Sequence, residues 1–323
     1  MIINTSSALP RQDLQVLYDE APPDFQGIAD IIMPEFAVPS VAGKGYRATR
    51  EEVLGLYDTQ RAPKSAYKSS DDRLEDFDYA VQDHGLTSKL DDSERRMYAS
   101  AFDYAAVVAN RLRNKILRKR EYTVASALIN TTNFPLSGTT GHTVGTAWSS
   151  TSATPIADVN TAVTNFYANS GMLPNTLVLN WLTARWLSRV TEVYNQLATS
   201  GQTGVVIPGT PLSEAQLAGV FGIDRVVIAK VPYNSAKQGQ TASISDVWNN
   251  GYAFLCRTSS SMDISEPCIG RMWRWTDDAG DLGTVLLEQY RDEDVRSDVL
   301  RARFGYGVSL LDSACGYLID IVP

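Results

Sequence analysis

The side chains that carry most enzyme chemistry are scarce in this sequence and widely spaced. Among 323 residues there are only two histidines, His84 and His142, and three cysteines, Cys256, Cys268 and Cys315. Metal sites and imidazole bases need such residues in close, patterned groups, and the spacing here forms none. An odd number of cysteines also argues against a disulfide framework. We interpret the cysteines as reduced packing residues and expect no metal site.

Two short motifs come close to known sites but lack essential residues. Gly43-Lys44 could belong to a phosphate-binding loop, but that motif needs Gly where Val38 stands and Ser or Thr where Gly45 stands. Asp292 and Asp294 lack the glycine and the distal glutamate of a calcium loop. Neighbouring carboxylates occur by chance in a chain with 37 acidic residues, so they do not indicate acid–base catalysis. The sequence predicts no catalytic residue, no cofactor and no enzyme activity.

The strongest charge feature is basic, in a chain with a formal net charge of -8. Residues 110–120 read NRLRNKILRKR and include Arg111, Lys115, Arg118 and Lys119. One interpretation is a solvated helix face whose positive charge suits the C-terminal end of the helix dipole. The other is a face that contacts DNA through its phosphates, without sequence preference. Both stay open, although the acidic net charge disfavours a free-standing nucleic-acid-binding protein.

The basic run lies on a predicted long helix that extends from about Asp91 to Asn130. Asp91 can cap the free N–H groups at its start, and Glu94 follows three residues later, as in a capping box. Apolar residues recur every three or four positions and therefore line one face of the helix. These residues are Phe102, Ala105, Ala109, Leu112 and Ile116. The helix is expected to pack along one side only.

The segment before this helix, at about 36–78, is dense in charge and poor in large aliphatic residues. We predict an extended hairpin with Gly43 and Gly45 at its tip, where they can supply positive φ angles. An isolated hairpin is marginal in water, and a second copy of the same chain is the simplest partner. The candidates for contacts with a neighbouring subunit are Lys44, Arg47 and Arg50.

The rest of the chain mixes helices and strands, which predicts an α+β fold. Ile28 to Met33 is an apolar run that suits a buried strand. Thr154-Pro155 and Gly171 mark the start and end of a helix. Ser213 with Gln216 opens a capped helix that ends near Gly219. Strands are expected at 176–179, 225–231 and 252–257, and from 272 to the C-terminal end.

Length and composition predict a globular protein. With 323 residues and 44% hydrophobic content, the chain can bury a substantial core. The N-terminus lacks the basic start and the apolar core of a signal peptide, and no stretch reaches the roughly 20 apolar residues of a membrane span. We therefore expect a soluble protein that is not exported and has no membrane partner.

Three segments carry a resemblance to a known family. The first is the helix end LRKREYTVASAL at 117–128, with Arg120-Glu121, Ala125 and Leu128. The second is PNTLVLN at 174–180, and the third is LAGVFGIDRVVIAKVPYN at 217–234, which leads to VWNNGYAFL at 247–255. They occur in a chain that runs from an N-terminal arm through a charged extended loop, a long helix and an α+β unit to further strands. This order and these segments resemble the major capsid proteins of tailed phages, whose fold is named after phage Hong Kong 97.

The resemblance implies an α+β, Hong Kong 97-type fold with five parts. These are an N-terminal arm at 1–27, an extended E-loop with an adjoining strand at 28–90, a peripheral domain with a spine helix at 91–149, an axial domain at 150–270, and return strands of the peripheral domain with a C-terminal strand at 271–323. It also implies self-assembly of pentamers and hexamers into an icosahedral or prolate head around double-stranded DNA. Assembly would take place in the host cytoplasm, with scaffolding, portal and decoration proteins as candidate partners.

Two alternatives stay open. An encapsulin-like compartment would share the fold but enclose a cargo protein instead of a genome. A soluble enzyme, which belongs to a different class, would have an unrecognised site in the 150–270 unit. The mass discriminates between a shell and an enzyme, because a shell should run in the megadaltons and an enzyme should form a small oligomer.

Overall fold

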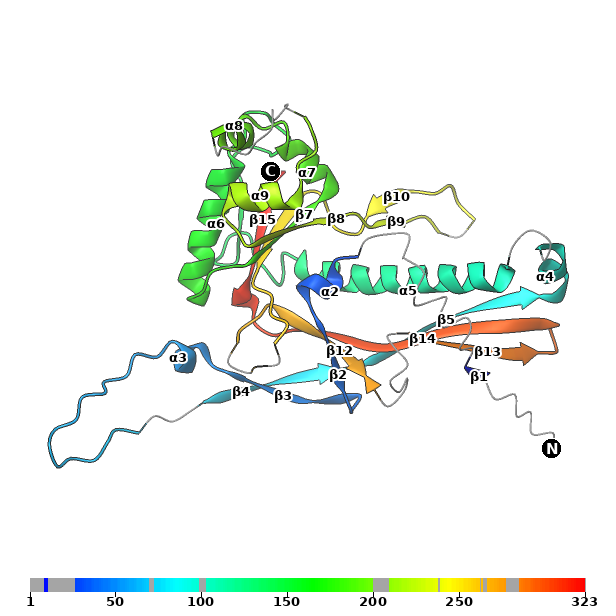
Figure 1. The fold of residues 1–323 in the computed structure, drawn as a ribbon, viewed down its shortest axis with the longest axis horizontal. Coiled ribbons are helices and arrows are strands. Elements are labelled where there is room, and N and C mark those ends of the chain that lie inside the picture. Colours follow the sequence, from blue (N-terminus) through cyan, green and yellow to red (C-terminus); the bar gives the residue numbers. More distant parts are fainter. Residues whose placement is uncertain are drawn as a thin grey trace.

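Two sheets, a long helix and a projecting hairpin give the chain an elongated shape (Figure 1). The computed structural model describes residues 9–10, 27–69, 73–98, 103–199, 209–237, 239–261, 263, 266–276 and 285–322. Helices surround one of the two sheets, which we call the first sheet. The other, the second sheet, runs lengthwise beside the long helix. Within the described residues, no helix combines the length and the apolar character needed to cross a membrane.

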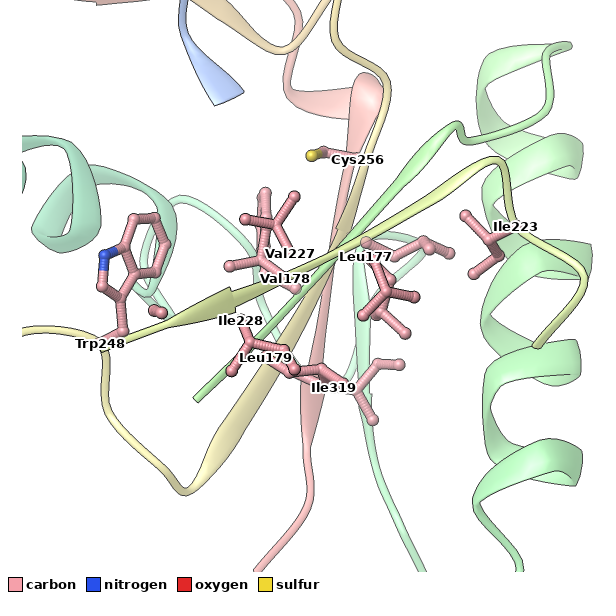
Figure 2. Packing of buried hydrophobic residues seen from close by; sticks show 14 of the residues in the cluster. Leu177, Val178, Leu179, Ile223, Val227, Ile228, Trp248, Cys256 and Ile319 are labelled. Atoms are coloured by element: carbon pink, nitrogen blue, oxygen red, sulfur yellow. The ribbon is translucent and has the colours of Figure 1, made fainter. Parts of the chain in front are cut away.

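The first sheet has the strand order β6-β15-β11-β7-β8. The strands are β6 (Gly141–Thr143), β15 (Gly316–Asp320), β11 (Tyr252–Cys256), β7 (Thr176–Asn180) and β8 (Arg225–Ala229). β7 lies between antiparallel β11 and parallel β8, and every residue of β7 is buried. A strand that is buried throughout is typical of a sheet covered on both faces. Figure 2 shows Leu177 and Leu179 of β7 in one cluster with Ile228 of β8 and Ile319 of β15.

Capping residues bound several of the helices around this sheet. The helices are α6 (Pro155–Ser170), α7 (Trp181–Leu187), α8 (Thr191–Thr199) and α9 (Glu214–Phe221). Gly171 closes α6 with a φ of 74°, in the left-handed region that favours glycine. Ser213 and Gln216 form the predicted capping box of α9. α9 continues past Gly219, where its end was expected, because the left-handed C-cap is Gly222.

The second sheet supports the long helix α5 (Tyr104–Leu128). Its described strands are β1 (Leu9–Pro10), β13 (Leu286–Asp292), β14 (Ser297–Leu310), β12 (Gly270–Trp275), β2 (Glu35–Val38) and β5 (Gln82–Asp91). β14 pairs with β13, β12 and β5 along its length. Ala109, Leu112 and Ile116 of α5 are buried in one cluster with Leu300 and Phe304 of β14. The predicted apolar stripe is confirmed at these positions.

The prediction of a single helix from 91 to 130 is wrong. The region contains α4 (Asp92–Tyr98) and α5 as separate helices. Asp91 lies at the start of α4, where its carboxylate accepts a hydrogen bond from the backbone N–H two residues on, at 2.7 Å. Asp103 is the N-cap of α5: its backbone is extended, and its carboxylate accepts from Ala105 N at 3.0 Å. A cap of this kind starts a new helix. Phe102 lies outside the described residues.

The prediction of a strand at 28–33 is also wrong, because the segment forms the helical turn α2 (Ala29–Ile32). The first N–H groups of a helix have no intrahelical partner. Here Glu121 of α5 accepts from Ile28 N at 2.9 Å and from Ala29 N at 3.0 Å. This carboxylate lies 93 residues from Ile28 along the chain, so the local sequence pattern could not reveal the turn.

The predicted hairpin is confirmed, but its glycines do not lie at the tip. β3 (Ala42–Ala48) pairs antiparallel with β4 (Leu74–Ala80), and the helical turn α3 (Arg50–Val53) follows β3. Gly43 and Gly45 lie within β3, and neither has a positive φ angle. A Cβ atom at Gly43 would lie 2.7 Å from the Tyr79 hydroxyl, and one at Gly45 would overlap the Phe77 ring. The glycines therefore make room for aromatic side chains on β4.

The remaining described elements are short. β9 (Pro232–Asn234) and β10 (Ile244–Asp246) form a small hairpin near α5, and the 3₁₀ turn η1 (Ser313–Cys315) precedes β15. β12, β13 and β14 belong to the second sheet, whereas β15 returns to the first. The division into arm, E-loop, peripheral domain and axial domain stays a prediction.

Candidate assembly surfaces

The outer part of the hairpin carries large apolar side chains that are open to solvent. Leu56 is 100% exposed and Tyr67 is 80% exposed. The other exposed large apolar residues of this part are Tyr46, Val53, Leu54, Tyr57 and Leu74. Single exposed apolar residues are ordinary, but a concentration of them marks an interaction site. We call residues 55–69, between α3 and β4, the outer loop.

Contacts among its own side chains organise the outer loop. An ion pair joins Lys68 to Asp58. The Arg61 guanidinium lies 4.3 Å from the centre of the Tyr67 ring. Lys64 has a φ of 69°, the left-handed conformation of a tight turn. A loop whose ends are joined and whose side chains pack on one another can present a defined surface.

The three basic residues that were predicted to touch a neighbouring subunit have partners within the chain. Lys44 lies in β3, not at the tip, and its hydrogen bond to Asp76 raises the pKa of the lysine. Arg47 Nη2 lies 2.9 Å from Glu75 Oε2 on the facing strand. Arg50 instead reaches from the hairpin to the rest of the molecule. A contact with another subunit stays a prediction for all three.

An aromatic cluster fixes the base of the hairpin to the second sheet. Trp273 of β12 is buried, and its ring centre lies 5.8 Å from that of Phe77 and 5.2 Å from that of Tyr79, both on β4. Phe36 of β2 packs on the same tryptophan, at 6.4 Å between ring centres. Aromatic pairs at such separations contribute about 0.5–1.5 kcal/mol beyond their buried area. The hairpin therefore has a firm root, while its outer part is uncovered.

The predicted basic face is solvent-accessible in the structure. Arg111, Lys115 and Lys119 of α5 are exposed, and Arg118 is half-buried. The Lys119 ammonium lies 5.2 Å from the centre of the Tyr122 ring. Three charges at four-residue spacing therefore form a stripe along one side of the helix. Contact of this stripe with DNA stays a prediction.

Two adjacent charged residues near the end of α5 are buried, and the sequence reasoning missed their role. Glu121 accepts hydrogen bonds from the start of α2 and from Trp248 Nε1, the latter at 2.7 Å. Burial raises the pKa of Glu121, and these hydrogen bonds oppose the rise. Arg120 pairs with Asp30 and Glu35, which ties α5 to α2 and β2. The sequence contains one sign that Arg120 is buried: it stands four residues after Ile116 and therefore lies on the apolar stripe of the helix.

Within the described residues, no group of three or more His, Cys, Asp or Glu side chains could hold a metal ion. His84 stacks on Tyr306 at 4.2 Å between ring centres, and His142 Nδ1 lies 3.2 Å from the Tyr317 hydroxyl. The cysteines are buried free thiols, and burial raises the pKa of Cys315 to about 12. A thiol that stays protonated is a poor nucleophile. These environments are typical of packing and not of a catalytic group.

Comparisons with known proteins concern the fold. No protein-family model and no curated protein matches the chain. A phage-related protein from Bordetella bronchiseptica RB50 is similar over 98% of this chain and 99% of its own, with 19% identity and a TM-score of 0.71. The capsid of cyanophage P-SCSP1u is similar over 93% of this chain and 89% of its own, with 12% identity and a TM-score of 0.62.

A third solved structure bears on the compartment alternative. A virus-like particle from Pyrococcus furiosus is similar over 96% of this chain and 96% of its own, with 9% identity and a TM-score of 0.53. All three likenesses span more than nine-tenths of this chain, so they concern the fold as a whole. The chain therefore has the α+β, Hong Kong 97-type fold of tailed-phage capsid proteins, as its sequence predicts.

Proposed function

We propose that this chain is the major structural subunit of a tailed-phage head. Copies of it would form pentamers and hexamers, and these would close into an icosahedral or prolate shell around double-stranded DNA. The fold likeness to an assembled cyanophage capsid, over 93% of this chain, supports the proposal.

The uncovered hairpin is the observation that carries this proposal. Two-stranded hairpins are marginally stable in water, yet this one exposes Leu56 and Tyr67 almost completely. Covering such a surface with another copy removes apolar area from water, which is the main source of stability in association. In the proposed shell the contact would be of the heterologous kind, with the hairpin of one copy on a different surface of the next. Heterologous contacts build rings and larger lattices instead of closed pairs.

We also propose that the stripe formed by Arg111, Lys115 and Lys119 contacts packaged DNA without sequence preference. Phosphate contacts release counterions, so each contact adds about 0.9 to the slope of log affinity against log salt concentration. Replacing the three residues with Gln should lower the slope measured for the unassembled chain on a DNA duplex. Lys230→Gln, an exposed change elsewhere, serves as the control. An unchanged slope in the triple variant would favour the solvated-face interpretation.

Electron microscopy with light scattering on the same sample tests the main proposal. Uniform hollow polyhedra, alone or with a co-expressed scaffolding protein, are the expected result. Compact monomers or dimers that never assemble with phage partners would contradict it. They would direct the search for a ligand site to the 150–270 unit.

A compartment that encloses cargo protein is the second candidate. The likeness to the Pyrococcus furiosus particle favours it, but with a TM-score of 0.53 against 0.71 and 0.62 for the other two structures. The contents of particles purified from producing cells separate the two candidates. A phage head holds double-stranded DNA, whereas a compartment holds a protein.

A further inference from the structure

One arginine connects the hairpin to the helical part of the molecule. Arg50, the first residue of α3, donates from Nη1 to the backbone oxygen of Asn169 at 2.7 Å. From Nη2 it donates to Asp312 Oδ1 at 3.0 Å. Asn169 belongs to the last turn of α6, and Asp312 precedes η1. We infer that Arg50 is a positioning residue, which sets the direction in which the hairpin leaves the body.

Both acceptors suit a guanidinium group. The last carbonyl groups of a helix have no intrahelical partner, and the helix dipole places partial negative charge there. Asp312 has a side chain that is only 12% exposed, and its Oδ1 also accepts from Ala314 N at 3.0 Å, which holds the carboxylate in place. The planar guanidinium group of arginine has several N–H groups and can donate to both acceptors at once. Lysine has a single nitrogen and is less suited to this geometry.

Packing reinforces this contact next to the arginine. The Leu54 side chain, just after α3, lies so close to Gly171 that a Cβ atom at Gly171 would overlap it. Gly171 thus has two functions, because it closes α6 in the left-handed conformation and leaves room for Leu54. We call Arg50 with Leu54 the outer attachment, and the aromatic cluster around Trp273 the inner attachment.

The two attachments are separated by open space. A cavity of about 240 Å³ lies between the hairpin and the body. It is lined by Tyr46, Arg47 and Phe77 from the hairpin and by Pro267, Arg271 and Leu311 from the body, among others. The side chains of the described residues do not fill this space, so the described contacts hold the hairpin on either side of the cavity and not across it. Loss of the outer attachment would leave the hairpin free to pivot at Trp273.

The outer attachment also maintains α3. This turn has four residues, and a helix of that length does not persist by itself in water. Its hydrogen bonds join Glu52 N and Val53 N to Thr49 O, and Leu54 N to Arg50 O, at 2.9–3.1 Å. The outer loop begins directly after Leu54, so the direction of α3 decides where Leu56 and Tyr67 are presented. The positioning role of Arg50 does not depend on the proposed function. Only the importance of the hairpin direction for shell assembly rests on that function.

Hydrogen–deuterium exchange on the full-length chain, kept below its assembly concentration, tests the inference without a shell. In Arg50→Gln, the amides of residues 52–54 should exchange roughly tenfold faster, because the turn loses two charge-assisted hydrogen bonds. Asp312→Asn should accelerate the same amides to a smaller degree. Asn is as good a helix-capping residue as Asp, so η1 should be retained.

Arg47→Gln is the matched control. Arg47 lies in the same hairpin and is also ion-paired, but its partner Glu75 belongs to the hairpin itself. In the Arg47→Gln variant, the exchange rates of the amides of residues 52–54 should stay within about twofold of those in the unmodified chain. Unchanged exchange in Arg50→Gln would overturn the inference, and so would an equal acceleration in Arg47→Gln. Either result would leave the proposal of a shell untouched, because shell formation is measured separately.

Discussion

The first sheet and the β3–β4 hairpin are both β-structure, but they obtain stability from different sources. All five residues of β7 are buried, and so are four of the five in β11 and in β15. In β3 and β4 no residue is fully buried. The sheet is covered on both faces by its own chain, whereas the hairpin relies on the aromatic cluster at its base and on the outer attachment.

This difference separates two properties that the proposed shell subunit would need. The sheet and its helices can fold and stay folded in a single copy, because their apolar surface is already removed from water. The hairpin presents apolar surface that the described residues of its own chain do not cover. Changes in the first region should therefore affect the subunit, and changes in the second should affect assembly.

The largest expected effect is the loss of assembly when the outer loop is removed. Replacement of residues 55–69 by a short Gly-Ser linker should abolish stable shells. The free energy of unfolding of the subunit should change by less than about 0.5 kcal/mol, because surface segments away from a core contribute little. Sedimentation and urea unfolding measure the two properties. Loss of the fold would mean that the loop belongs to a hydrophobic core. Normal shells would mean that the loop makes no essential contact between subunits.

The next effect concerns the core of the first sheet. Phe254 of β11 is buried against Phe134, with ring centres 5.0 Å apart. Phe254→Ala should lower the free energy of unfolding by about 3–5 kcal/mol through lost burial and a cavity. Tyr67→Ala in the outer loop is the control and should change it by less than about 0.5 kcal/mol. Similar values for both variants in urea unfolding would remove the contrast between the two regions.

A smaller, pH-dependent effect is expected at Glu121, which joins α5 to α2. Burial raises its pKa in the folded chain above the usual value of about 4.3 in an unfolded one. Its contribution to stability is therefore full below that value and is lost as the pH rises through the folded pKa. Glutamine does not ionise, so the stability of the Glu121→Gln variant does not decrease with pH through this group.

The variant should consequently be more destabilised, relative to the unmodified chain, at pH 4 than at pH 7. At pH 4 the difference in free energy of unfolding should be about 1–2 kcal/mol, the cost of an imperfectly satisfied buried hydrogen-bond network. Urea unfolding at both pH values checks the sign. A larger destabilisation at pH 7 would mean that the folded pKa of Glu121 is lowered.

The smallest effect is expected for one side chain of the outer loop. Leu56→Ser should leave subunit stability within about 0.5 kcal/mol but raise the concentration needed for assembly about tenfold, because one covered leucine is worth about 1.5–3 kcal/mol at most. Thr59→Ala in the same loop is the matched control and should assemble normally. Light scattering against protein concentration gives both values. Equal thresholds for the two variants would exclude Leu56 from the contact.

Local signals predicted the parts of the fold that local contacts determine. The Gly171 cap of α6, the capping box of Ser213 with Gln216, and the apolar stripe of α5 are all confirmed. Each depends on residues within one or two helical turns, so the sequence pattern carries the information. These local signals predicted an α+β fold, and the order of the elements together with the segments that resemble tailed-phage capsid proteins predicted the Hong Kong 97-type arrangement.

Contacts between distant residues determine what the sequence reasoning missed. α2 is a helical turn because Glu121, far along the chain, accepts its free N–H groups. Gly43 lies in a strand, where a side chain at this position would overlap Tyr79, and it does not serve a turn. Arg50 was expected to touch a neighbour, but its nearest acceptors come from α6 and from the segment before η1. No local pattern distinguishes these residues from ordinary turn or surface residues.

Limited digestion with trypsin, on free subunits and on assembled shells of the same chain, tests most directly whether another copy covers the outer loop. Arg61, Lys64 and Lys68 lie in this exposed loop and are cleavage sites for trypsin. We expect rapid cleavage at these residues in the free subunit and strong protection in the shell. Equal cleavage rates in both states would contradict it, because the outer loop would then be as open in the shell as it is in the single chain.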